Sequence, residues 1–331
     1  MNDLREDEKT ISRRKFLIRM MKAGASITAA GALAAFLHDK KAPSGYAGGE
    51  VVQIPDFSLE KDARSLAIVS GENRKLTLEK AIDALGGIGR FIKKGDRVLI
   101  KVNAAFATPP VLCATTHPDL VREMIALCLK AGASEARVTD NPINDPASCF
   151  LLTGIREATE SSGGKLILPK SEYFKHTTLI NGNLIRDWPV LYAPFDGVTK
   201  LIGMAPLKDH HRSGASMTMK NWYGLLGGRR NIFHQDIHNI IKELAMMVKP
   251  TLAILDGTNA MMTNGPTGGS LSDLKATNML IAGTDSVAID AFGSALLERR
   301  LSDLPFIQKA ADMGVGTADY ESLKPVRITI N

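Results

Sequence analysis

From Ser65 onward, short runs of apolar residues alternate with longer segments in which apolar positions recur at helical spacing. Strand-like runs occupy residues 66–69, 97–102, 136–140, 166–168, 200–204, 252–256, 279–282 and 326–330. Helical periodicity occurs at residues 76–85, 119–131, 155–161, 216–225, 235–248 and 286–299. This alternation predicts an α/β fold with a mostly parallel sheet covered by helices on both faces.

The middle of the chain interrupts this alternation. Residues 177–180 and 183–185 flank the pair Asn181-Gly182, which readily adopts the positive φ angles of a tight turn. We therefore expect an antiparallel hairpin insertion at about 170–195, inside a single domain that covers residues 65–331.

The first 47 residues have the order of an export leader. Arg13-Arg14 precedes Phe16-Leu17, an Ala/Gly-rich stretch runs from Ala23 to Leu37, and small residues surround Ala47. This pattern is typical of a twin-arginine signal peptide. An amphipathic N-terminal helix and an uncleaved anchor are the alternatives, although about 15 apolar residues are few for a hydrocarbon core roughly 30 Å thick.

We therefore predict a signal peptide at 1–47, a linker at 48–64, and an exported, periplasmic protein without a transmembrane span in its mature chain. The twin-arginine translocation machinery is the expected partner. Proteins exported by this route often fold, and take up a cofactor, before they leave the cytoplasm.

Most of the net positive charge lies in the predicted leader. The 331 residues carry a net charge of +6, but residues 1–47 hold nine basic and five acidic residues and so supply +4 of it. The body has no basic stripe beyond the pair Arg229-Arg230, so we expect no nucleic-acid partner.

Three cysteines are too few for a four-thiolate cluster, so we expect no intrinsic iron–sulfur cluster. Cys128 lies in an apolar helical run and is predicted to be a small buried residue. Pairing of Cys113 with Cys149 in an oxidising compartment stays open.

Polar residues recur where the predicted strands end. Asn103 and Asp140 follow the second and third strands, Asp256 ends a later one, and His117 precedes a helix. Ligands of parallel sheets bind at this edge, although Asp and Asn also cap helices and Gly-Pro also forms turns.

The segment 206–234 is the richest in reactive side chains. Its histidines and lysines would repel a bare cation but attract a carboxylate, a phosphate or a metal-bound anion. His234 and His238 lie four residues apart, a spacing with which two imidazoles bind one metal on a helix. Alternatively, one caps the helix and the other is a surface residue. Methionines at 217, 219, 246 and 247 indicate core packing rather than copper binding.

These observations predict three groups of site residues. The catalytic candidates are Lys208, His210 and Lys220. The cofactor-binding candidates are Asn103, His117, Asn221, Arg229, Gly265 and Gly268. The metal-ligand candidates are His210, His211, His234, His238, Asp256 and Asp290. The cofactor is not identified, and a single transition metal is one candidate. No Gly-Lys-Ser/Thr loop or G-x-G-x-x-G supports nucleotide binding.

Several motifs resemble domain-of-unknown-function family 362 in the family's order, between about Ser65 and Leu297. They are Val98–Asn103, Thr116–Pro118, Pro206–His210, Met219–Gly224, Phe233–His234, Lys249–Pro250, Asp256–Gly257, Gly265–Pro266 and Asp285–Asp290. The resemblance implies no reaction, because the family has none in general. Many relatives are fused to ferredoxin-type modules, whose clustered cysteines this chain lacks. The Lys208–Lys220 segment alone is also similar to the sites of nickel-pincer racemases of the lactate racemase type.

Two functions follow as hypotheses. The first is an exported enzyme or redox-associated factor whose metal- or anion-binding cleft acts on a small acidic ligand or a redox partner. The second is a non-catalytic periplasmic protein that binds a ligand or delivers a metal.

Overall fold

The computed structural model describes Met20, residues 52–59 and residues 64–330. The chain divides into two units, Met1–Gly45 and Tyr46–Asn331. The predicted signal peptide lies outside the described residues except for Met20, and the description below concerns the second unit.

An eight-stranded sheet forms the centre of this unit, with the order β10-β1-β9-β8-β7-β2-β3-β4. β9 is antiparallel to both neighbours, and the other adjacent strands are parallel, so the predicted mostly parallel sheet is confirmed. The strands are β1 (Leu66–Ser70), β2 (Arg97–Lys101), β3 (Glu135–Thr139), β4 (Lys165–Ile167), β7 (Lys200–Lys208), β8 (Leu252–Met261), β9 (Leu274–Gly283) and β10 (Val326–Thr329).

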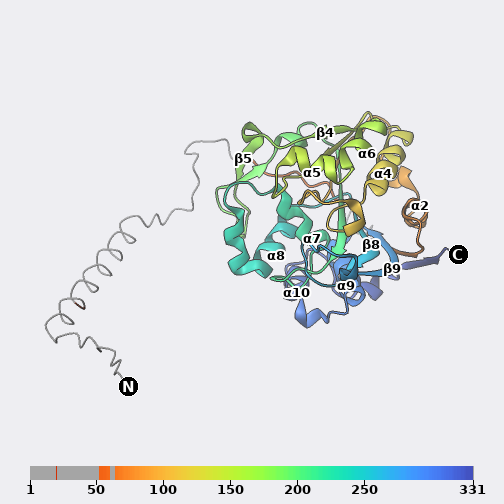
Figure 1. Cartoon of the computed structure of the whole chain (residues 1–331). Helices are drawn as coiled ribbons and strands as arrows, with labels where there is room; N and C mark the ends of the chain where they lie inside the picture. Colours follow the sequence, from red (N-terminus) through yellow and green to blue (C-terminus); the bar gives the residue numbers. More distant parts are fainter. Residues whose placement is uncertain (1–19, 21–51, 60–63, 331) are drawn as a thin grey trace, which may run out of the picture. The chain divides into compact units, whose positions relative to one another are not determined.

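Helices cover both faces of the sheet, as the apolar strands require (Figure 1). Successive residues of one strand enter opposite cores: Ile100 packs in one and Leu99 in the other. The Ile100 core includes α2 (Arg74–Ala84), α3 (Ile88–Phe91), α4 (Pro118–Lys130), α5 (Pro146–Leu152) and α6 (Ile155–Ser161). The Leu99 core includes α7 (Thr218–Asn221), α8 (Ile237–Met247), α9 (Ser286–Leu296) and α10 (Pro305–Asp312).

The hairpin insertion is present, but its strands lie outside the predicted ones. β5 (Phe174–Thr177) and β6 (Trp188–Leu191) pair antiparallel, and Asn181 has a φ of 64° in the intervening loop. The backbone N–H groups of residues 183–185 bind the buried carboxylate of Glu243 on α8. These groups are therefore bound to a helix and do not extend the ladder.

Two central strands run further than predicted. β7 continues to Lys208 and β8 to Met261, each past a register shift. The predicted helix 216–225 is the short α7 followed by a 3₁₀ helix at Trp222–Leu225. The predicted helix 235–248 is likewise divided between a 3₁₀ helix at Arg230–Asp236 and α8.

Residues 52–59, which we expected to be linker, pack against the domain. Val52, Ile54 and Phe57 are buried, and the backbone N–H of Phe57 donates to the carbonyl of Lys249 at 3.0 Å. Cys128 is buried as predicted, and Cys113 and Cys149 are free thiols. Among the described residues, no helix combines the length and the apolar composition needed to cross a bilayer.

Candidate functional site

A cavity of about 710 Å³ opens where β2, β3 and β7 end. Segments far apart in the sequence meet there: the loops after β2 and β3, the end of β7, the α7 segment and the loop after β8. Its lining residues with polar side chains are Lys101, Asn103, Asp140, Asn141, Lys208, His210, His211, Ser216, Lys220, Asn221, Tyr223, Arg230, His234, Asn264 and Thr267.

Lys101 and Asp140 form a fully buried ion pair in this cavity, with Nζ and Oδ1 2.7 Å apart. Lys101 also donates to the backbone oxygen of Val102 at 2.8 Å and to the Asn221 backbone and side-chain oxygens at 2.5 and 3.0 Å. Burial lowers the pKa of Lys101, and the Asp140 charge opposes that shift. A Cβ at position 224 would lie 2.0 Å from Asp140 Oδ1, so the α7 segment approaches the pair this closely because residue 224 is glycine.

Arg230 adds a positive charge whose position is fixed. One terminal nitrogen donates to the carbonyl oxygens of Tyr223 and Leu226, and the other to those of Asn141 and Pro142, at 2.8–3.3 Å. Both terminal nitrogens of Arg230 already donate to backbone carbonyls. Arg230 therefore contributes positive charge to the cavity, and its terminal nitrogens are not available as donors to a ligand.

Lys208 and Lys220 are the reactive cations of the cavity. Burial, then the Lys220 charge, lowers the pKa of Lys208 to about 7. Burial, then the Arg230 charge, lowers the pKa of Lys220 to about 7. Lys208 donates to the backbone oxygen of Ala114 at 2.5 Å and lies 5.2 Å from the centre of the Phe106 ring.

Three imidazole rings stack along one wall. The His210 ring centre lies 5.0 Å from that of His211 and 5.7 Å from that of His234, with nearly parallel planes. His210 Nδ1 accepts the backbone N–H groups of Arg212 and Ser213 at 3.2 and 3.3 Å. Burial, followed by the Lys220 charge, lowers the pKa of His210 to about 2. His210 is therefore neutral, with its proton on Nε2, and its free nitrogen is a donor.

The outer two rings have the opposite arrangement. His211 Nδ1 lies 3.3 Å from the carbonyl oxygen of Gly265, and His234 Nδ1 lies 3.2 Å from that of Asn231. A carbonyl can only accept, so each Nδ1 carries hydrogen, and the lone pair of a neutral ring is then on Nε2. His211 and His234 could thus ligate a metal, whereas His210 could not in this tautomer. Among the described residues, no three His, Cys, Asp or Glu side chains are grouped as a metal site.

The Gly265–Gly268 loop closes one side of the cavity. The backbone N–H of Gly265 donates to Asp209 Oδ2 at 3.0 Å, and a Cβ there would lie 1.9 Å from the Asp209 carbonyl oxygen. Gly268 has a φ of 58°. Small residues are needed here because the loop packs directly on the end of β7.

The structure brings nine of the predicted residues together in this cavity: Asn103, Lys208, His210, His211, Lys220, Asn221, His234, Gly265 and Gly268. Five others are outside the cavity lining: His117, Arg229, His238, Asp256 and Asp290.

Asp256 and His117 lie on the α2 side of the sheet. We took Asp256 as the end of its strand, but β8 continues, and Asp256 Oδ2 instead contacts Arg74 Nε at 2.9 Å. His117 caps α4 by accepting the backbone N–H of Asp119 at 3.3 Å. Burial and the Arg74 charge lower the pKa of His117.

The remaining three predicted residues are Asp290, Arg229 and His238. Asp290 is fully buried and accepts the backbone N–H groups of Thr218 and Met219, which begin α7, and burial raises its pKa to about 7. Arg229 is exposed. His238 belongs to α8 and stacks on Phe306 with ring centres 6.1 Å apart. His234 belongs to the preceding 3₁₀ helix, so the two histidines are not one turn apart on a single α-helix, although both line a separate hollow with His211.

Sequence reasoning missed Lys101, Arg230 and Tyr223 as members of this cavity. Lys101 carried the clearest signal, since it is a lysine within a strand that is otherwise buried. Arg230 and Tyr223 depend on a tertiary turn that no local pattern shows.

Comparison with known proteins gives a family match and a similar protein from a cyanobacterium. A family model described as "Domain of unknown function (DUF362)" matches residues 98–295. The thylakoid-associated protein sll1697 of Synechocystis sp. is 25% identical over 266 residues, which make up 76% of this chain and 78% of that protein.

Two solved structures are more distantly similar. The lactate racemase apoprotein from Thermoanaerobacterium thermosaccharolyticum gives 11% identity and a TM-score of 0.36, and a Thermotoga maritima protein gives 12% and 0.35. Each comparison covers 72% of this chain and 58% of the other, so the chain spans less than two thirds of their length.

Proposed function

The chain belongs to the family of the domain of unknown function DUF362, and we propose that it is an enzyme that binds a small organic anion and moves a proton with Lys220. The observation that carries this proposal is the pair Lys208 and Lys220, both buried in one cavity with pKa values of about 7. Such amines exchange protons readily at neutral pH.

The charge of the cavity supports an anionic ligand. Apart from the histidines, the charged lining residues that the structure describes are four cations and one carboxylate, Asp140. Asp140 already binds Lys101 and accepts the backbone N–H of Ala104 at 2.6 Å. A bound carboxylate would offset the remaining positive charge at a site shielded from water.

Lys220 suits the role of base better than its neighbours. Lys101 has four hydrogen-bonding contacts and Lys208 donates to Ala114. The Lys220 ammonium instead lies over the Tyr223 ring, 5.2 Å from its centre, which leaves its hydrogen-bonding capacity for a ligand. Its neutral form could accept a proton from a bound molecule, while protonated Lys208 holds the negative charge.

His210 would orient the ligand. Two backbone N–H groups fix its Nδ1 as an acceptor, so its Nε2–H is directed by the fold as a donor. We infer that it donates to an oxygen of the bound anion. A metal is not required for this step. If one binds, His211 and His234 are the imidazoles whose Nε2 could hold it, and it would polarise an oxygen of the ligand.

We also propose that the protein is exported or membrane-associated. The twin-arginine motif and the thylakoid association named for a relative support this proposal. Fractionation of cells that carry Arg13→Lys/Arg14→Lys tests it. The exported fraction should be lost, and an unchanged distribution would contradict the twin-arginine route.

Native mass spectrometry and elemental analysis of the mature protein test the proposed function. A bound organic anion, lost in Lys220→Met and retained in the surface control Lys165→Met, is the expected result. Screening of the released molecule for proton exchange in deuterated water then separates an enzyme from a binding protein. Binding without proton exchange would favour a protein that stores or delivers the ligand. If Lys220→Met retains the bound anion as Lys165→Met does, this cavity is not the binding site.

A further inference from the structure

The cavity at the ends of β2, β3 and β7 also has an apolar wall. We use this name for Ala105 and Phe106 from the loop after β2, Ile143 from the loop after β3 and Pro266 from the loop after β8. The proposed proton transfer needs none of these residues, because charged and hydrogen-bonding groups are sufficient to hold an anion. The apolar wall therefore bears on the part of the ligand that is not charged.

Backbone and packing contacts fix two members of the apolar wall. The backbone N–H of Ile143 donates to the carbonyl oxygen of Ala105 at 3.0 Å, so the loops after β2 and β3 lie side by side. Phe106 belongs to a small hydrophobic cluster with Ala114 and Met261. Because these contacts lie within the protein, this part of the apolar wall is formed before a ligand binds.

The exposed fraction changes along the apolar wall. Phe106 is 8% exposed, whereas Ile143 is 64% exposed and therefore lies at the opening of the cavity. Apolar surface thus extends from the buried part of the cavity to its opening. A ligand that covered this surface would remove it from water, which is favourable in proportion to the apolar area covered.

The charged part of the cavity and the apolar wall meet at Lys208. Its Nζ lies 5.2 Å from the centre of the Phe106 ring. A carboxylate bound to this ammonium group would therefore place its neighbouring carbon atoms beside Phe106. The other cations described in the lining, Lys101, Lys220 and Arg230, belong to β2, α7 and a 3₁₀ helix. A second negative charge beside the apolar wall would receive no cation from the wall itself, and its burial there would be costly.

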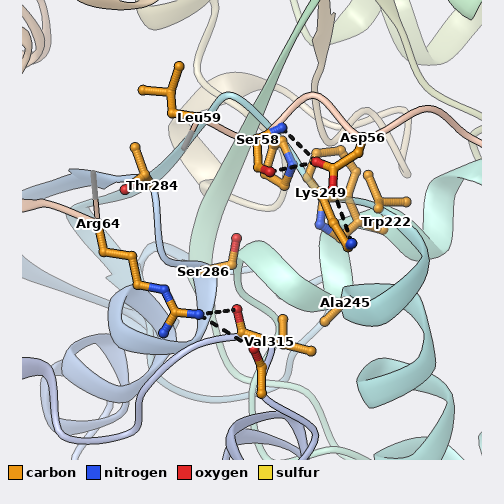
Figure 2. Close-up of a pocket in the computed structure, with 13 residues that line it drawn as sticks. Asp56, Ser58, Leu59, Arg64, Trp222, Ala245, Lys249, Thr284, Ser286 and Val315 are labelled. Atoms are coloured by element: carbon orange, nitrogen blue, oxygen red, sulfur yellow. Dashed lines mark hydrogen bonds and ion pairs between the residues drawn. The ribbon is translucent and has the colours of Figure 1, made fainter. Parts of the chain in front are cut away.

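A smaller cavity also touches the α7 segment, at Trp222 (Figure 2). Its volume is about 160 Å³, close to the roughly 150 Å³ in which benzene binds in another protein. Asp56 and Lys249 in its lining are paired with each other, with Oδ2 and Nζ 3.1 Å apart (Figure 2). The cavity with the apolar wall has about 710 Å³ and is lined by Lys208 and Lys220. An anion with an apolar part therefore fits the larger cavity and not the smaller one.

We propose that the ligand is an amphipathic monocarboxylate, with its carboxylate at Lys208 and Lys220 and an apolar tail along Phe106 and Ile143. This inference rests on the proposed function, because it places the anion among the same lysines. A volume of about 710 Å³ is several times that in which benzene binds, so it has room for the hydrocarbon chain of octanoate. Octanoate combines a single charge with an apolar tail, as the lining of this cavity requires.

A series of carboxylates of increasing chain length tests the tail. Isothermal titration calorimetry of the mature protein, washed at high salt to remove bound anions, compares butyrate, hexanoate and octanoate. Affinity should rise about twofold with each added methylene, half the free energy of complete burial, because the apolar wall covers one side of the chain. Adipate has as many carbon atoms as hexanoate but a second carboxylate, and it should bind more weakly.

Matched serine variants locate the tail. Ile143→Ser should lower the affinity for octanoate about threefold and so reduce the gain in affinity from butyrate to octanoate. Ile180→Ser is the control, because Ile180 is 74% exposed and lies in the loop between β5 and β6, outside the cavity lining. Since both isoleucines are exposed, neither substitution leaves a hole in the hydrophobic core.

The outcomes separate this inference from the proposed function. Equal affinity for butyrate and octanoate would overturn the apolar tail and leave the anion site in place. Equal binding of adipate and hexanoate, or an equal effect of the two serine variants on octanoate binding, would also overturn the tail alone. Failure of all four carboxylates to bind would overturn both the tail and the anion site.

Discussion

Buried cations on the two faces of the sheet differ in whether they have a carboxylate partner. On the α2 face, Arg74 and Asp256 form a matched pair with atoms 2.9 Å apart. On the α7 face, Lys101 has Asp140 as a counter-charge, but Lys208 and Lys220 form no ion pair with a carboxylate in the part of the chain that the structure describes. The first arrangement is complete without a ligand. The second retains positive charge at a stability cost, which is the expected state of a site that binds an anion.

The largest predicted effect comes from removing a cavity cation. Lys208→Met or Lys220→Met should weaken anion binding about 100-fold or more and yet stabilise the fold, because a desolvated ammonium is replaced by an apolar chain of similar volume. Isothermal titration calorimetry with the ligand released from the native protein, alongside chemical denaturation, measures both effects. Retained affinity or lower stability in both variants would break the contrast between the faces.

Gly224→Ala should lower the free energy of unfolding by about 3 kcal/mol, because the new methyl group would meet Asp140 and Lys101 in a packed site. Gly314→Ala is the control for a new methyl group that meets no neighbouring atom. Gly314 has a φ of 73° and open space around it, so this substitution strains the backbone without a steric clash. Urea denaturation compares the two. A loss at position 224 no greater than that at position 314 would contradict close packing around the ion pair.

The α2 face should respond differently to loss of a cation. Arg74→Met should lower the free energy of unfolding by about 2 kcal/mol, since it leaves the buried Asp256 carboxylate unpaired. Anion binding in the cavity should be unchanged. Denaturation and calorimetry on this one variant give both values. A higher free energy of unfolding in Arg74→Met would show that the buried Arg74 charge destabilises the fold, and this would remove the contrast between the two faces.

The pH dependence gives a further test. Lys208 and Lys220 have pKa values of about 7 in the folded chain and 10.5 when unperturbed, so the unfolded chain holds more protons between these limits. Stability should therefore rise with pH from about 7 to about 10. Anion affinity should fall over the same range, as the ammonium groups lose charge. Denaturation of the wild type and of Lys220→Met at several pH values measures the change in stability. The variant should show a smaller rise in the free energy of unfolding between about pH 7 and about pH 10.

The smallest effect is expected from Arg229→Gln. Arg229 is exposed and outside the cavity lining, so anion affinity should change less than twofold at moderate salt. Its neighbour Arg230, which binds four carbonyl oxygens, provides the contrast. The same calorimetry measures the anion affinity of both variants. A larger loss of affinity with Arg229→Gln than with Arg230→Gln would contradict the assignment of Arg230, and not Arg229, to the cavity.

Local patterns were sufficient to predict the eight strands of the main sheet and the helices α2, α4, α6, α8 and α9, because buried strands and amphipathic helices differ in period. They did not predict the helices α3, α5 and α10. They also predicted the concentration of lysine and histidine on one segment, 206–234. They did not predict the helices against which Asp256 lies: strand alternation places Asp256 on the same face as Ile254, but which helices cover that face depends on the tertiary fold. Nor did they predict Arg230, whose place depends on carbonyls of a loop almost 90 residues away.

Direct titration of Lys220 tests the central claim most closely. The ¹³Cε chemical shift of Lys220 in the folded mature protein, assigned with Lys220→Met, reports the protonation of its amine. The structure predicts a midpoint of about 7, with the amine partly neutral and ready to accept a proton at physiological pH. A midpoint at the ordinary lysine value of 10.5 would contradict the account, because Lys220 would then be a permanent cation and no base.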